Sequence, residues 1–163
     1  MGSPEASTST KALHAYVASA EPAGDRAGMG VVFVDAHGRV LRRIGRTLPG
    51  VTSRELAAFR GILFALWNSR RFGTRRIVVH ADTPDVIAQI NGEREITPAL
   101  VGPYLEVRAL LHAYRGARVK ADETLWGREA AALAETAVQH DTDDTIEDLP
   151  LWAGQPALTR STA

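Results

Sequence analysis

Two neighbouring stretches decide the fold, Val51-Thr-Ser-Arg-Glu-Leu-Ala-Ala-Phe-Arg-Gly-Ile-Leu-Phe-Ala-Leu66 and Arg76-Ile-Val-Val-His-Ala-Asp-Thr83. The first predicts a helix over residues 53–68, because its apolar side chains recur every three or four residues. The second predicts a buried strand that ends just before Asp82. Ligands of α/β sheets gather beyond the carboxyl ends of parallel strands, so Glu55 on the first helical turn and Asp82 can converge there. Two close carboxylates are typical ligands of a divalent cation.

The rest of the chain continues this alternation of strands and helices and predicts an α/β domain. The first three strands read as an antiparallel meander, because tight turns separate them. The element order is β-β-β-α-β-α-α-β-α. Strands are expected at residues 13–20, 30–35, 39–48, 76–81 and 118–120, and helices at 53–68, 83–90, 98–114 and 128–139, with the 98–114 helix broken at Gly102-Pro103.

Length and composition predict one domain with flanking segments. A chain of 163 residues that is 45% apolar can fill one core. We expect a disordered lead over residues 1–11, the domain over 12–139 and an acidic, flexible tail over 140–163. The chain has no cysteine, no segment apolar enough to span a bilayer and no signal-peptide pattern, so we expect a cytoplasmic protein.

Charge is distributed unevenly although the whole chain is neutral. Residues 139–163 hold five acidic residues against one arginine, a net charge of −4. Because the total is zero, the remainder of the chain carries +4. A mildly basic body can attract phosphate, while an acidic tail competes for the same surface.

The element order and the motifs around Glu55 and Asp82 resemble the type 1 ribonuclease H family. That family reads roughly Asn-Arg-Met-Glu-Leu and Thr-Asp-Ser where this chain has Ser53-Arg-Glu-Leu56 and Ala81-Asp-Thr83. The resemblance implies a ribonuclease H-like fold, with a mixed five-stranded sheet and helices on both faces. It also implies cleavage of RNA–DNA hybrids by two Mg²⁺ ions that four carboxylates hold.

Two of those four carboxylates are replaced by alanine. The resemblance expects an Asp on the first strand, where the chain has Ala18, and another on the last helix, where it has Ala131. Glu55 and Asp82 remain as a remnant catalytic and metal site, so Mg²⁺ binding is expected to be weak or absent. Other acids near these points are candidate substitutes: Glu21, Asp25, Asp122, Glu123, Glu129 and Glu135.

Several other residues have a functional and a plain interpretation. Arg42, Arg43 and Arg46 are candidate phosphate contacts or a solvated surface. Trp126 can stack on a base or cap the core. His80 shares a strand face with Asp82, so it is either a ligand or proton carrier or a buried histidine with satisfied hydrogen bonds.

Together these observations predict a nucleic-acid-binding pseudoenzyme whose partner is an RNA–DNA hybrid or duplex. One alternative is an active, divergent Mg²⁺-dependent ribonuclease that uses Glu55, Asp82 and a relocated acid. The other is a protein-interaction module that docks a protein partner through a sheet edge or through Leu149-Pro-Leu-Trp152. No membrane partner is expected.

Overall fold

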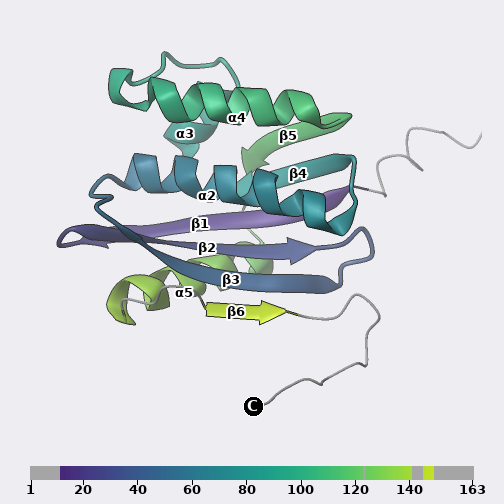
Figure 1. The fold of residues 1–163 in the computed structure, drawn as a ribbon, viewed down its shortest axis with the longest axis horizontal. Coiled ribbons are helices and arrows are strands. Elements are labelled where there is room, and N and C mark those ends of the chain that lie inside the picture. Colours follow the sequence, from purple (N-terminus) through teal and green to yellow (C-terminus); the bar gives the residue numbers. More distant parts are fainter. Residues whose placement is uncertain (1–11, 123, 141–144, 149–163) are drawn as a thin grey trace, which may run out of the picture.

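A computed structural model describes residues 12–122, 124–140 and 145–148 of the chain. The described residues form one mixed sheet with helices on both faces (Figure 1). None of the helices in these ranges is long and apolar enough to cross a membrane. The predicted lead, the Leu149–Trp152 segment and Glu123 lie outside the described residues.

Within the described residues, six strands run in the spatial order β5-β4-β1-β2-β3-β6. The neighbours β1 and β4, and β4 and β5, are parallel, whereas the other neighbours are antiparallel. This confirms the predicted mixed sheet, with β6 as an additional strand at one edge. The strands are β1 (Leu13–Ala23), β2 (Arg26–Val34), β3 (Val40–Pro49), β4 (Arg76–Ala81), β5 (Gly116–Ala121) and β6 (Thr145–Asp148).

The helices begin and end within about three residues of the predicted positions. The Ser53 hydroxyl oxygen caps the first helix by accepting from the Leu56 backbone N–H at 3.2 Å. Pro103 lies in the first turn of α4, where its missing N–H interrupts no helical hydrogen bond, so the predicted break at Gly102-Pro103 was wrong. The helices are α2 (Arg54–Ser69), α3 (Pro84–Ile90), α4 (Val101–Ala113) and α5 (Leu125–His140), with short 3₁₀ turns at Arg70–Phe72 and Pro98–Leu100.

The two faces of the sheet are covered by different helices. The main core lies between the sheet, α2 and α4, and Phe33, Phe59 and Ile62 are completely buried in it. On the opposite face, α5 packs over β1, β2 and β3 (Figure 1). The α5 face of β4 and β5 therefore remains uncovered by that helix.

Small residues let α5 approach the sheet closely. A Cβ atom built at Gly30 would lie 2.0 Å from the backbone oxygen of Ala130, and one built at Gly28 would lie 2.5 Å from that of Ala134. The Thr47 hydroxyl donates to a further α5 carbonyl oxygen at 2.6 Å. Glycines on β2 and alanines on α5 thus determine how α5 packs.

Four residues of the segment predicted as an acidic tail continue the sheet. β6 pairs antiparallel with β3, and its register places Asp148 opposite Arg42 and Glu147 opposite Arg43. A net-charge argument did not predict this pairing, because it carries no information about strand register.

Candidate functional site

Asp82 lies where β4 ends, beside β1 and the start of α2. Its Oδ1 accepts a hydrogen bond from the Thr83 hydroxyl at 3.0 Å. Its Oδ2 lies 3.4 Å from the Ser19 backbone nitrogen and 3.5 Å from Nη2 of Arg54. Asp82 therefore lies beyond the carboxyl end of β4, where the sequence predicts it.

Arg54 connects two acids that are distant in the sequence. Its Nη1 lies 3.5 Å from Oε2 of Glu21, which follows the middle of β1, while its Nη2 faces Asp82. The side chains of Arg54, Glu21 and Asp82 are 43%, 77% and 30% exposed, so each ion pair is worth less than about 1 kcal/mol. The guanidinium nevertheless supplies the positive charge beside Asp82.

Glu55 lies in the same helical turn as Arg54 and is half-buried. Because Arg54 contacts Asp82, the first turn of α2 meets the end of β4. Among the described residues, Glu55 has no ion pair, whereas the residue before it has two. The separation of the Glu55 and Asp82 carboxyl groups stays a prediction.

Ala18 and Ala131 belong to one apolar cluster beneath the first half of α5. Ala18 is completely buried there with Tyr16, Val32 and Ala130, and Ala131 packs against the edge of the cluster. The fold thus brings together the two positions at which the resemblance expects aspartate. Methyl groups occupy both positions.

The described candidate substitute acids contact groups other than Glu55 and Asp82 or lie exposed at the surface. Glu129 accepts from Nε of Arg43 at 2.8 Å and so faces β3. Oδ2 of Asp122 accepts from the Thr124 backbone N–H at 3.1 Å and lies in space that Gly127 leaves open. Glu21 faces Arg54, while Asp25 and Glu135 are exposed.

These donors do not match the four-carboxylate set of the resemblance. In the described ranges, no three His, Asp or Glu side chains are grouped so that they could hold a metal ion. The remnant pair consists of Glu55 and Asp82, and Arg54 lies within 3.5 Å of the latter. A two-ion centre therefore does not fit this donor set.

A stack of aromatic rings lies beside the site on the α5 face of the sheet. His80 on β4 stacks on Tyr16 of β1, with ring centroids 4.3 Å apart and an interplanar angle of 12°. His80 Nε2 and His14 Nδ1 lie 2.9 Å apart and share a hydrogen bond. His80 Nδ1 lies 3.9 Å from Oδ1 of Asp122, a buried oxygen that has no hydrogen-bond partner among the described residues.

This environment keeps His80 neutral. Burial and, next, the charge of His14 lower the pKa of His80 to about 4, although Asp122 opposes the shift. Burial also lowers the pKa of His14, as do the charges of Lys120 and Arg118. The plain interpretation of His80 is therefore supported by its hydrogen bond to His14. Sequence reasoning missed His14 and Tyr16, although strand alternation places both on the face that His80 shares.

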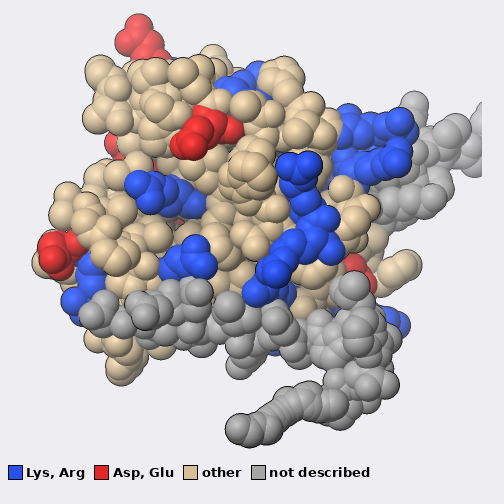
Figure 2. All heavy atoms as spheres, in the orientation of Figure 1, with Lys and Arg blue, Asp and Glu red and all other residues tan. Residues whose placement is uncertain are grey.

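The predicted nucleic-acid contacts lie on two faces of the sheet. The Arg46 guanidinium carbon lies 4.6 Å from the ring centroid of Phe64 on α2, and alternation along β3 places Arg42 on that same face. Arg43 instead faces α5 through Glu129. Trp126 is half-buried at the start of α5 and packs against the cluster of Ala18. Figure 2 shows basic side chains spread over the face that carries α2 and β3, with fewer acidic ones.

Comparison with known structures shows the same fold in ribonucleases H. RNase H1 from Halobacterium salinarum superposes with a TM-score of 0.72 at 23% identity, covering 80% of this chain and 98% of the archaeal chain. The N-terminal RNase H domain of a Mycobacterium tuberculosis protein gives 0.71 at 22% identity, covering 78% and 94%. LC11-RNase H1 from compost, in complex with an RNA/DNA hybrid, gives 0.71 at 17% identity, covering 79% and 98%.

Sequence comparison identifies the family. No curated protein matches the chain. The family model described as reverse transcriptase-like matches residues 18–140, which run from the middle of β1 to the end of α5. The match covers most of the chain and all of the elements around Asp82. The chain therefore belongs to the reverse transcriptase-like family and has the ribonuclease H fold.

Proposed function

We propose that this protein is a nucleic-acid-binding ribonuclease H-like domain that does not cleave RNA–DNA hybrids. One observation carries the proposal: the Arg54 guanidinium lies 3.5 Å from both Asp82 and Glu21. A fixed positive charge at this point competes with a divalent cation for the same carboxylates. Mg²⁺ then binds weakly or not at all.

The packing around Ala18 supports the same proposal. Ala18 is completely buried among apolar side chains, and its methyl group offers no ligand to an ion. A relocated acid is needed to restore a second ion, and Glu129 and Glu21 already face arginines. Asp122 lies beside His80, and its Oδ2 is held by a backbone N–H.

The basic face supports nucleic acid as the partner. Arg42 and Arg46 lie on the α2 face of β3, which is called the basic face below. A structural relative, LC11-RNase H1, is known in complex with an RNA/DNA hybrid. Contacts between arginines and phosphates do not require the metal ligands, so binding can persist without cleavage.

A binding experiment tests the retained function. The full chain should bind an RNA–DNA hybrid with an affinity that falls as salt rises, because phosphate contacts release counterions. The double variant Arg42→Gln/Arg46→Gln should bind about tenfold more weakly and with a shallower salt slope. Arg115→Gln, an exposed charge outside β3, is the matched control. Equal affinities of the double variant and the control would show that the basic face is not used.

A cleavage experiment tests the loss of catalysis. A labelled hybrid should stay intact in Mg²⁺ or Mn²⁺ with the wild-type protein. Cleavage that disappears with Asp82→Asn would establish the active, divergent ribonuclease instead. A protein that neither binds nor cleaves any hybrid or duplex would leave the protein-interaction module as the better interpretation.

A further inference from the structure

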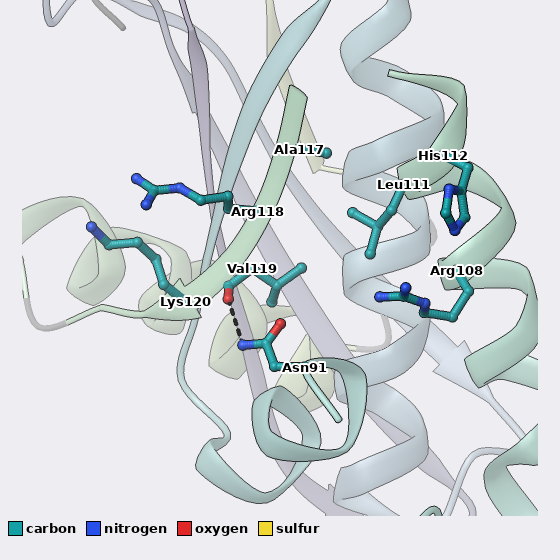
Figure 3. A pocket seen from close by; sticks show the side chains of 8 residues that line it. All are labelled: Asn91, Arg108, Leu111, His112, Ala117, Arg118, Val119 and Lys120. Carbon is teal, nitrogen blue, oxygen red and sulfur yellow. Dashed lines mark hydrogen bonds between the residues drawn. The ribbon is translucent and has the colours of Figure 1, made fainter. Parts of the chain in front are cut away.

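Three cations lie in a row on the α5 side of β4 and β5: Arg76, Arg118 and Lys120. Figure 3 shows Arg118 and Lys120 extending from β5 on the side opposite to α4. Because side chains alternate along a strand, position 116 faces the same way. A Cβ atom built at Gly116 would lie 2.8 Å from Nη1 of Arg76, which the register places opposite it on β4. The Arg76 side chain therefore lies over Gly116 and begins the row.

The row carries uncompensated positive charge. Its two members on β5 are exposed, and its member on β4 is half-buried. Within residues 12–122, 124–140 and 145–148, none of the three has a carboxylate within ion-pair distance. Asp122, which follows the row, is only 4% exposed, and its oxygens face the Thr124 N–H and His80. Like charges repel one another, so the row favours a negatively charged partner.

The surface that carries the row lies beside α5 rather than beneath it (Figure 1), because α5 packs over β1, β2 and β3. The ring stack of His14, Tyr16 and His80 borders the row on the same side of the sheet. Burial lowers the pKa of His14, and the charges of Lys120 and Arg118 lower it further. The half-buried His14 ring is therefore a neutral, flat group beside the cations.

The spacing of the row suits an extended polyanion. Residues two apart on a strand lie about 6.6 Å apart, which is comparable to the distance between successive phosphates of an extended nucleic-acid strand. Rings beside a basic surface are typical of proteins that bind single strands, because bases stack on them. Bases of a duplex are already paired and stacked, so the ring of His14 favours a single strand.

Protection of the sheet edge accounts for only part of this arrangement. β5 is an edge strand, and the charges of Arg118 and Lys120 discourage pairing with another chain. Arg76 lies on β4, however, which is paired on both sides, and adds nothing to edge protection. The absence of a side chain at Gly116 lets this third charge join the row.

We propose that the row of Arg76, Arg118 and Lys120 binds the sugar–phosphate backbone of an extended, single-stranded nucleic acid. A guanidinium can bind phosphate through two parallel hydrogen bonds, and two of the three cations are arginines. The proposal goes beyond the proposed function, because this surface lies on the other face of the sheet from Arg42 and Arg46 and takes a different form of nucleic acid.

Titration of the ¹⁵N-labelled full chain with a short oligothymidylate that has no terminal phosphates tests the surface. The backbone amides of residues 116–120 should shift, and the affinity fitted to these shifts should fall as salt rises. Arg118→Gln/Lys120→Gln should weaken this binding about tenfold. It should also reduce the slope of log affinity against log salt by about 1.4, because each phosphate contact of a single strand contributes about 0.7.

Two further variants separate the row from net charge and from edge protection. Arg39→Gln/Arg60→Gln removes the same charge from exposed positions on the β2–β3 turn and α2, so it is the matched control and should bind like the wild type at residues 116–120. Arg76→Gln should weaken binding severalfold although β5 is unchanged. If Arg76→Gln unfolds, Gly116→Ala replaces it, because its methyl group displaces the Arg76 guanidinium while every charge stays.

Poly-L-glutamate is the probe for an acidic protein segment. If it shifts residues 116–120 and oligothymidylate does not, the surface belongs to an acidic peptide and the proposal is overturned. Absence of oligothymidylate shifts at these residues, or equal binding by either row variant and the control, would overturn it as well. The outcome is separate from hybrid binding through β3, which the Arg42 and Arg46 variant reports.

Discussion

Arg54 is the residue that most affects the chemistry around Asp82. Arg54→Gln removes a positive charge 3.5 Å from two carboxylates, so the affinity for Mn²⁺ should rise severalfold. Calorimetric titration or Mn²⁺ relaxation measurements would detect the change. Stability should change by less than about 1 kcal/mol, because these ion pairs are exposed. Arg54→Lys keeps the charge and should resemble the wild type, whereas equal Mn²⁺ binding by all three proteins would contradict this role.

His80 predicts a pH dependence of stability. Its pKa is about 4 in the folded protein against an ordinary 6.5, so below pH 6.5 the unfolded chain binds the proton more readily. The free energy of unfolding should therefore fall by up to about 3 kcal/mol between pH 6.5 and 4 and then level off. Urea unfolding across this range would measure the slope.

His80→Phe keeps an aromatic ring against Tyr16 and removes the titrating group. It should flatten most of the slope, and the residual slope reports His14, whose pKa is also lowered. His37→Gln, an exposed residue in the turn between β2 and β3, is the control and should leave the profile unchanged. A wild-type stability that is constant from pH 6.5 to 4 would rule out a neutral, buried His80.

At the scale of elements, the contact of α5 with β2 depends on a missing side chain. Gly30→Ala places a Cβ 2.0 Å from the Ala130 carbonyl oxygen, which is backbone and cannot rotate away. α5 must shift, and unfolding free energy should fall by about 2 kcal/mol or more. Gly102→Ala in α4 meets no atom within 4 Å and should be neutral or slightly stabilising. Thermal unfolding of both variants makes the comparison, and similar midpoints would contradict the packing argument.

The strand β6 connects acidic residues to basic β3. Removing residues 141–163 removes Glu147 and Asp148, which lie opposite Arg43 and Arg42 in the register. Hybrid binding should tighten, most at low salt, where screening is least. Thermal stability should decrease slightly, because β3 loses a neighbouring strand.

A shorter deletion supplies the control for β6. Removing residues 149–163 keeps the strand and deletes one basic and no acidic residue, so hybrid affinity should change little. Fluorescence anisotropy with one labelled hybrid compares all three proteins. Unchanged affinity after the longer deletion would show that the acidic segment does not compete for the nucleic-acid surface.

At the scale of the whole molecule, restoring the two missing aspartates should change both the stability of the fold and metal binding. Ala18→Asp/Ala131→Asp buries a carboxylate in an apolar cluster, so the variant should melt well below the wild type without a metal. Mn²⁺ should raise its melting temperature and not that of the wild type, because an ion that binds only the folded state stabilises it. The variant should also move toward hybrid cleavage if the remaining scaffold is intact. Ala18→Ser/Ala131→Ser changes polarity without charge and is the control.

Local sequence determined the elements and the position of the remnant acids. The capped helix of Arg54–Ser69 and the strand Arg76–Ala81 were predicted because spacing, capping and turn residues act within a few positions of one another. The order of these elements restricted the topology, so the mixed sheet and Asp82 at its edge followed. The two alanines could likewise be read directly at their positions.

Tertiary structure alone decided which side chains meet. The approach of Arg54 to Asp82 and Glu21 and the ring stack of His80 join residues that lie far apart in the sequence. Their distances depend on strand register and helix packing, which are set by the whole core rather than by any local pattern. A spacing argument identifies which acids are present, but the packed chain decides which cation lies beside them.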